Sequence, residues 1–254
     1  MELIVLGSGT CVPDPVRYPS SHLLRLDDGE LWLLDVGVGC LQQLMRAGEN
    51  PNEIDHIFIS HNHPDHVGGL AALIQSYTHA PGFKRESTLN IYGSNDVGNY
   101  LHYVQSFSAS FESGFDIAFH HLVDGQEFVV GEAILRTAAA IHPIPTQALR
   151  VESYGKVLLY GADGAPCDAV TELAIGADLL LLEAAYPSSM KSDVHQTIVQ
   201  AVEVALNAKA RKLVLVHLYP EVLAMSHDQR CSEFKTLNYP GEVIFADDLA
   251  RFIF

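Results

Sequence analysis

The segment 60–70, with the sequence SHNHPDHVGGL, constrains the fold of this chain more than any other stretch. It follows an apolar run and places three histidines and one aspartate within six positions. A short apolar run is typical of a buried strand, and the two glycines that follow favour a turn into a helix. In an extended chain His61 and His63 face the same way, while Asp65 and His66 follow where we expect the helix to begin.

These four side chains are of the types that bind divalent metal ions. Imidazole and carboxylate groups are ligands for zinc and similar ions, so four of them at one strand end can serve two adjacent metals. The alternative is a polar turn whose histidines face water. That alternative would be preferred for one histidine, but four ligand-type residues at this spacing favour a metal site.

Strand-like and helix-like segments alternate along the 254 residues without repeats or low-complexity linkers. The predicted strands lie at 2–7, 21–36 with a hairpin turn at Asp27-Asp28-Gly29, 56–60, 88–93, several within 116–160, 178–186, 212–219 and 242–245. The predicted helices lie at 38–48, 67–77, 95–108, 166–175 and 195–208, and 78–88 is predicted to be a mobile loop. Two blocks of strands, each followed by helices, predict an α/β fold with two packed sheets and helices outside. We expect one domain over residues 1–254.

The charge of the chain limits its partners. Fifteen lysines and arginines stand against 31 aspartates and glutamates, which gives a net charge of -16 with histidine neutral. We therefore expect no broad nucleic-acid surface. A polyanionic substrate can still bind through metal ions, because two divalent cations supply about four positive charges.

The cysteines and the hydropathy pattern indicate a cytoplasmic protein. Cys11, Cys40, Cys167 and Cys231 are widely spaced and form no CxxC pair, so we expect them to be reduced. The first apolar stretch is short and is preceded by Glu2, and no later stretch approaches the roughly 18 apolar residues of a membrane span. We expect neither a signal peptide nor a membrane segment.

Several motifs together carry a family resemblance. The segment 60–70 resembles the HxHxDH signature of the metallo-β-lactamase superfamily, whose fold is an αβ/βα sandwich of two mixed β-sheets flanked by helices. VLGSGTCVPDPVRYPSSHLLRL at 5–26 and LLDVGVG at 33–39 resemble the N-terminal motifs of its ribonuclease Z-like branch. The later landmarks of that branch occur in order, namely His142 in AIHPIP, Asp163 in LYGADGAP, Glu183 in LLLLEAAYP, His195 in DVHQT and His217 in LVLVHLYP.

The resemblance implies a site for two divalent metal ions, with zinc as the first choice and manganese or iron as alternatives. It implies three ligands to each metal and one bridging ligand: His61, His63 and His142 for the first, Asp65, His66 and His217 for the second, and Asp163 between them.

The later ligands also have a local interpretation from the sequence. His217 ends an apolar strand and His142 follows one, so both are expected where a loop meets the edge of a sheet. Either histidine alone would be read as structural, and Asp163, between Gly161 and Gly164, could be a turn residue. Their occurrence in the family order favours the ligand interpretation. GSGTCV at 7–12 lacks the third glycine of GxGxxG, so no dinucleotide site is predicted there.

The resemblance further implies a metal-dependent hydrolase, and the motif set favours a phosphodiesterase. Its nucleophile would be a hydroxide activated by the dinuclear centre. Asp65 would orient or deprotonate the attacking water. His195 would stabilise a phosphoryl oxygen or protonate the leaving group, and Glu183 would orient His195. The alternatives are a helix cap for His195 and a strand-end charge for Glu183.

The spacing of the landmarks bears on the substrate. Members of this branch that process transfer RNA carry a protruding arm between the positions of His142 and Asp163, whereas here only 20 residues separate them and predict a plain hairpin. This favours a small phosphodiester or short RNA. Two alternatives stay open: an ester, lactone or sulfate-ester hydrolase on the same centre, and a non-catalytic metal or nucleotide sensor. Family analogy also suggests a homodimer, and places Arg17 and Tyr18 near the mouth of the site.

Overall fold

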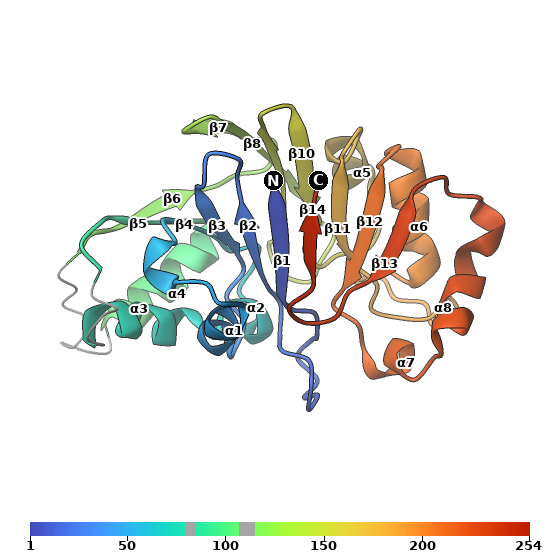
Figure 1. Cartoon of the computed structure of the whole chain (residues 1–254), viewed down its shortest axis with the longest axis horizontal. Coiled ribbons are helices and arrows are strands. Elements are labelled where there is room, and N and C mark those ends of the chain that lie inside the picture. The colour runs from blue at the N-terminus through green and yellow to red at the C-terminus, as the bar shows by residue number, and fades with distance from the viewer. Residues whose placement is uncertain (80–84, 107–114) are drawn as a thin grey trace. The chain divides into compact units, whose positions relative to one another are not determined.

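Figure 1 shows the computed structural model of the chain, which describes residues 1–79, 85–106 and 115–254. Contacts divide the chain into two compact units, Met1–Leu122 with Asp248–Ile253, and Val123–Asp247 with Phe254. Each unit has its own sheet and its own cluster of buried apolar side chains. The prediction of one domain over residues 1–254 stays a prediction.

The first unit contains a mixed sheet of seven strands among its described residues, in the order β14-β1-β2-β3-β4-β5-β6. Neighbours are antiparallel from β14 to β3 and parallel from β3 to β6. The strands are β1 (Glu2–Gly7), β2 (Ser21–Arg25), β3 (Leu31–Leu34), β4 (His56–Phe58), β5 (Leu89–Gly93), β6 (Ile117–His121) and β14 (Arg251–Ile253). The helices are α1 (Cys40–Ala47), the 3-10 helix η1 (Pro51–Glu53), α2 (Pro64–Val67), α3 (Leu70–His79) and α4 (Asn95–Ser106).

The core of the first unit lies between this sheet and its helices. Alternate side chains of a strand point to the same face, and Ile4, Leu33 and Ile57 place apolar groups on one face of the sheet. Leu44 of α1 and Leu73 of α3 belong to the same buried cluster. The helices therefore cover one face of the sheet, as Figure 1 shows for α1 and α3.

The second unit contains another mixed sheet of seven strands among its described residues, in the order β13-β12-β11-β10-β9-β8-β7. Neighbours are antiparallel from β7 to β10 and parallel from β10 to β13. The strands are β7 (Glu127–Val130), β8 (Ala133–Ala139), β9 (Gln147–Ser153), β10 (Lys156–Tyr160), β11 (Leu179–Glu183), β12 (Lys212–Val216) and β13 (Glu242–Phe245). The helices are α5 (Asp168–Leu173), α6 (Ile198–Asn207), α7 (Pro220–Leu223), α8 (His227–Phe234) and the 3-10 helix η3 (Lys235–Leu237).

The core of the second unit lies between its central parallel strands and α6. Leu180 of β11 and Leu213 of β12 cluster with Val202 of α6. The helix begins with a capping box, in which Thr197 accepts a hydrogen bond from the backbone of Gln200 and the Gln200 side chain accepts one from the backbone of Thr197. This box fixes the start of α6 at Ile198, so His195 precedes the helix instead of opening it, which corrects the predicted start at 195.

The predicted helix 67–77 is two helices, α2 and α3, which are separated at Gly68 and Gly69. A Cβ atom at Gly69 would lie 2.4 Å from the carbonyl oxygen of Gly37, so the chain approaches another backbone segment closely there. Because α3 runs to His79, the loop predicted from 78 begins too early. The rest of the predicted loop includes residues 80–84, which lie outside the described residues. Residues 107–108, at the end of the predicted helix 95–108, also lie outside them.

Helices α7 and α8, and strand β14, lie in stretches for which the sequence predicted no element. The remaining predicted elements are present with shifted ends, usually by one to four residues. Among the described residues, no helix is both long enough and apolar enough to cross a membrane.

Candidate metal centre

The first group of predicted ligands lies directly after β4 in the first unit. His61 and His63 follow the strand, and α2 carries Asp65 and His66 in its short turn. Pro64 occupies the first turn of α2, where its fixed φ favours entry into a helix. The sequence therefore places four ligand-type side chains at one strand end as predicted. His61, Asp65 and His66 are buried, and His63 is half-buried.

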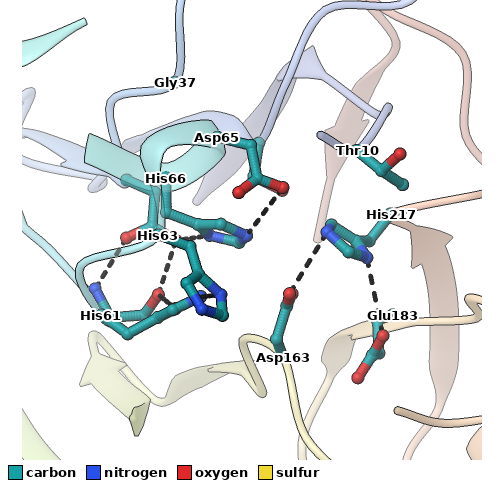
Figure 2. Close-up of polar contacts among 12 residues, drawn as sticks. Thr10, Gly37, His61, His63, Asp65, His66, Asp163, Glu183 and His217 are labelled. Atoms are coloured by element: carbon teal, nitrogen blue, oxygen red, sulfur yellow. Dashed lines mark hydrogen bonds and ion pairs between the residues drawn. The ribbon is translucent and has the colours of Figure 1, made fainter. Parts of the chain in front are cut away.

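Each buried histidine of this group has one nitrogen beside a supporting residue and the other beside a second ligand-type group. Figure 2 shows His66 beside Asp65. Nδ1 of His61 lies 2.9 Å from Oγ of Ser60, and Nδ1 of His66 lies 2.7 Å from Oδ2 of Asp35. Nε2 of His61 lies 3.1 Å from Nδ1 of His63, and Nε2 of His66 lies 3.8 Å from Oδ2 of Asp65. In both buried rings one nitrogen is held in place while the other faces a second ligand-type group, which is the arrangement found around protein metal sites.

Asp35 is a functional candidate that the sequence prediction missed. It follows β3, is fully buried, and accepts hydrogen bonds from the backbone N–H and the hydroxyl of Ser60, each at 2.7 Å, besides its contact with His66. Its φ of 58° is in the left-handed region, which aspartate tolerates better than most residues. The available signal is the aspartate of LLDVGVG at 33–39, a segment that carries part of the family resemblance.

We expect Asp35→Asn to weaken metal binding by about 10- to 100-fold, the usual effect of losing such a support. Asparagine keeps the shape of the side chain but turns one acceptor into a donor, which would face the donors of Ser60 or His66. Competition with a chromogenic chelator measures the change. Asp28→Asn, in the exposed hairpin turn, is the matched control and should bind metal like the wild type. Equal affinities of the two variants would remove Asp35 from the site.

The second group of predicted site residues lies in the second unit, where three neighbouring strands end. Asp163 follows β10, Glu183 ends β11, and His217 follows β12. These strands are parallel neighbours, so their carboxyl ends meet at one edge of the sheet, where α/β proteins place their ligand sites. Ala162 and His217 adopt left-handed backbone conformations, with φ of 55° and 52°. Such conformations cluster at functional sites.

Glu183 connects the second group (Figure 2). Its Oε2 lies 3.6 Å from Nδ1 of His217, a contact that Figure 2 marks with a dashed line. Its Oε1 accepts a hydrogen bond from the backbone N–H of Gly164 at 2.6 Å, and its Oε2 also lies 2.9 Å from Nδ1 of His195. Nε2 of His217 lies 3.2 Å from Oδ2 of Asp163. Possible ligand atoms of Asp163, Glu183, His195 and His217 all lie within 4.8 Å of one another.

The environment of His195 favours its protonated form. Burial alone would lower the pKa of His195, but the hydrogen bond to Glu183 and the charges of Glu183 and Asp163 outweigh burial, so this pKa lies above its ordinary value. The ring of His195 is half-buried, with its centroid 5.2 Å from that of His142. Nδ1 of His142 lies 3.1 Å from the carbonyl oxygen of Val194, so Nε2 is the nitrogen that His142 could offer to a metal ion.

Two tyrosines beside His195 were also missed in the sequence. The ring centroids of Tyr186 and Tyr219 lie 5.1 Å apart, and each ring lies about 6 Å from that of His195. Both tyrosines are half-exposed. Tyr186 is three residues beyond Glu183, in the motif LLLLEAAYP, and Tyr219 is two beyond His217, in the motif LVLVHLYP.

The donors on the two units suit divalent metal ions. A zinc ion holds imidazole nitrogens at about 2.0–2.1 Å in tetrahedral geometry, which puts two such nitrogens a little over about 3 Å apart. The 3.1 Å between the nitrogens of His61 and His63 is close to this spacing. Oxygen and nitrogen donors, with no cysteine in either group, are compatible with zinc, manganese or iron.

The family model described as beta-lactamase superfamily domain matches residues 32–218, which contain both groups. The chain therefore belongs to the metallo-β-lactamase superfamily. Within it the chain is ribonuclease Z-like: a ribonuclease Z from Pyrococcus furiosus is 30% identical over 271 positions, which cover 87% of each protein.

Solved structures confirm the predicted fold. The crystal structure of human tRNase Z, short form, has a TM-score of 0.82 and 25% identity, and covers 100% of this chain and 99% of that one. The metallo-β-lactamase fold protein YhfI from Bacillus subtilis has a TM-score of 0.83 and 24% identity, and covers 99% of this chain and 98% of that one. The fold is that of the superfamily, with two mixed sheets and helices.

The stretch between His142 and Asp163 is the plain hairpin that the sequence predicts. Strands β9 and β10 pair directly, and Tyr154 and Gly155 form the turn with φ of 51° and 74°. Positive φ at both positions is typical of the two-residue type I′ turn. The alignment to the Pyrococcus protein spans 271 positions, more than the 254 residues of this chain, so that protein contains residues that this chain lacks.

Proposed function

We propose that this protein is a metal-dependent phosphodiesterase that hydrolyses a small phosphodiester or a short RNA. The observation that carries the proposal is the pairing of His195 with Glu183 beside Asp163 and His217. A protonated imidazole that is oriented by a buried carboxylate is suited to donate a proton to a leaving alkoxide. Membership of the ribonuclease Z-like branch supports the choice of a phosphodiester.

We assign the metal ligands as the family resemblance implies. One ion would be held by His61, His63 and His142, and the other by Asp65, His66 and His217, with Asp163 bridging. When bound, divalent ions at such a site supply a water nucleophile at neutral pH and neutralise the charge on the phosphoryl group.

The protein's own side chains would then direct the displacement. Asp65, through a carboxylate oxygen, accepts a hydrogen bond from the attacking water and orients its lone pair toward phosphorus. As the new P–O bond forms, the bond to the leaving oxygen breaks. His195, whose Nδ1 is held by Glu183, gives the proton on Nε2 to that leaving oxygen.

Three features support a small substrate over a precursor transfer RNA. The hairpin β9–β10 occupies the stretch in which the transfer RNA enzymes of this branch carry their arm. The chain carries a net charge of -16, which opposes a broad contact with a polyanion. The aligned Pyrococcus ribonuclease Z contains residues that this chain lacks, which is compatible with an absent arm.

A substrate panel tests the proposal. Metal-loaded protein should hydrolyse bis(p-nitrophenyl) phosphate and leave p-nitrophenyl acetate, simple lactones and p-nitrophenyl sulfate largely intact. The reverse preference would replace the phosphodiesterase by an ester, lactone or sulfate-ester hydrolase. A metal-loaded protein that turns over no member of the panel would support a metal or nucleotide sensor instead.

Removal of metal should abolish turnover and lower thermal stability. A ligand present at about 100 times its Kd stabilises a fold by about 2.7 kcal/mol, and about 1 kcal/mol changes the Tm of a chain of this size by about 2–4 °C. Treatment with EDTA followed by gel filtration should therefore lower the Tm by about 5–10 °C, measured by differential scanning fluorimetry. Zinc or manganese should restore both the Tm and turnover, whereas an unchanged Tm would argue against bound metal.

A further inference from the structure

A cavity of about 500 Å³ in the first unit opens beside Asp65. Pockets of this volume are typical of small-molecule sites. Its walls are largely apolar and include Val12, Pro13, Pro15 and Val38. Val12 and Val38 are 36% and 56% exposed, so they display apolar surface at the cavity instead of packing into a core. These apolar side chains are available for contact with a ligand in the cavity.

The loop 8–18, which forms one wall of the cavity, is fixed at both ends by one carboxylate. Asp248 accepts hydrogen bonds from the backbone N–H and the hydroxyl of Ser8 at 2.8 and 2.7 Å, and from the backbone N–H of Tyr18 at 2.8 Å. It also accepts one from Nε2 of Gln43 at 3.0 Å. A carboxylate offers two oxygens and four acceptor positions, so these four donors match its capacity.

The charged groups of the wall have partners within the loop. Arg17 donates from Nη1 to the hydroxyl of Ser8 at 2.5 Å, which draws the guanidinium toward the base of the loop. Asp14 accepts hydrogen bonds from the backbone N–H groups of Val16 and Arg17 at 2.8 and 3.0 Å. Asp14 also lines the cavity, and its negative charge disfavours a second phosphate group there.

Tyr18 lines the cavity, and its ring lies close to Gly39. A Cβ atom at Gly39 would lie 2.4 Å from Cδ1 of the Tyr18 ring, and the φ of Gly39 is 90°. Any other residue at position 39 would displace this ring and strain the backbone. The position of the Tyr18 ring in the cavity lining therefore requires glycine at position 39.

We infer that this cavity binds an uncharged, largely apolar organic substituent of the phosphodiester, and that Asp248 is a positioning residue that holds the cavity wall. The inference rests on the proposed function, because it takes Asp65 as the group that orients the attacking water. The attacking and leaving oxygens lie on opposite sides of phosphorus in a displacement of this type. The substituent beside Asp65 is therefore the one that stays on the phosphate, such as an aryl group or a nucleoside.

The test compares two substrates that have the same leaving group. Bis(p-nitrophenyl) phosphate retains an aryl substituent, whereas methyl p-nitrophenyl phosphate retains only a methyl group. The wild type should prefer the aryl substrate through a lower KM. Val38→Asp should raise the KM for the aryl substrate by about tenfold or more, the usual effect of a charge in an apolar pocket, and should raise the KM for the methyl substrate by much less. Val129→Asp, at an exposed position on β7 outside the cavity lining, is the matched control.

Asp248→Asn tests the positioning role. Its amide nitrogen would face one of the four donors, so the loop should shift and the KM for the aryl substrate should rise while kcat for the methyl substrate holds. Equal loss of kcat on both substrates would indicate a general structural role and would contradict the positioning role.

Calorimetric titration with bis(p-nitrophenyl) phosphate separates the two proposals. If the wild type binds the ligand without hydrolysing it and Val38→Asp binds it at least tenfold more weakly, the cavity assignment stands and the phosphodiesterase proposal fails. The cavity assignment is overturned if Val38→Asp prefers the aryl substrate over the methyl substrate as strongly as the wild type does. If neither protein has turnover, equal affinities of Val38→Asp and the wild type for bis(p-nitrophenyl) phosphate also overturn it.

Discussion

His63→Ala should abolish both metal binding and turnover. Nδ1 of His63 lies 3.1 Å from Nε2 of His61, and the side chain is half-buried, so its removal takes away a ligand without opening a large cavity in the core. We expect the variant to keep its fold, to contain no bound metal by mass spectrometry, and to hydrolyse bis(p-nitrophenyl) phosphate no faster than the buffer does.

His121→Ala is the control for this variant, because His121 is an exposed histidine at the end of β6. It should retain the metal content and the turnover of the wild type. If His63→Ala kept its full metal content, the ligand assignment of the segment 60–70 would be wrong.

His195→Ala should keep its metal and lose about 10²- to 10⁴-fold in kcat, the range that a general acid or base contributes. In the proposed role, Nδ1 of His195 is bonded to Glu183 at 2.9 Å and Nε2 acts on the substrate, so loss of the ring should leave the assigned metal ligands in place. Measurement of kcat and of metal content on the same preparation distinguishes the two roles.

The leaving group provides the control for His195. A good leaving group such as p-nitrophenolate needs little protonation, so the loss should be smaller with bis(p-nitrophenyl) phosphate than with a dinucleotide. Retained turnover on the dinucleotide would refute the acid role, and loss of metal would make His195 a ligand.

The sequence predicted the strands and the ligand-type residues because both leave local signals. Apolar runs such as the one in β11 identify buried strands, and the functional groups stand directly after them. Helix α8 was missed because none of its residues is buried, so it has no apolar stripe. Its capping box, Ser226 with Gln229, was the available signal. Strand β14 has three residues and forms only by pairing with β1 at the other end of the chain.

The supporting residues were harder to predict because their partners are remote in sequence. Asp35 is 31 positions from His66, and Asp248 is 240 positions from Ser8. An aspartate after a strand is common, and only the folded chain shows which donors surround it. Arg17 was predicted to lie near the mouth of the site, and it does line the cavity beside Asp65. Its partner could not be predicted: the guanidinium donates to the hydroxyl of Ser8 within the loop.

Titration of metal-free protein with zinc or manganese, followed by the rate of bis(p-nitrophenyl) phosphate hydrolysis, tests the dinuclear phosphodiesterase most directly. The ligand assignment predicts that activity rises with added metal and reaches its plateau at about two equivalents per chain, the capacity of a dinuclear site. A plateau at one equivalent would contradict the dinuclear centre, and a fully loaded protein without turnover would contradict the phosphodiesterase itself.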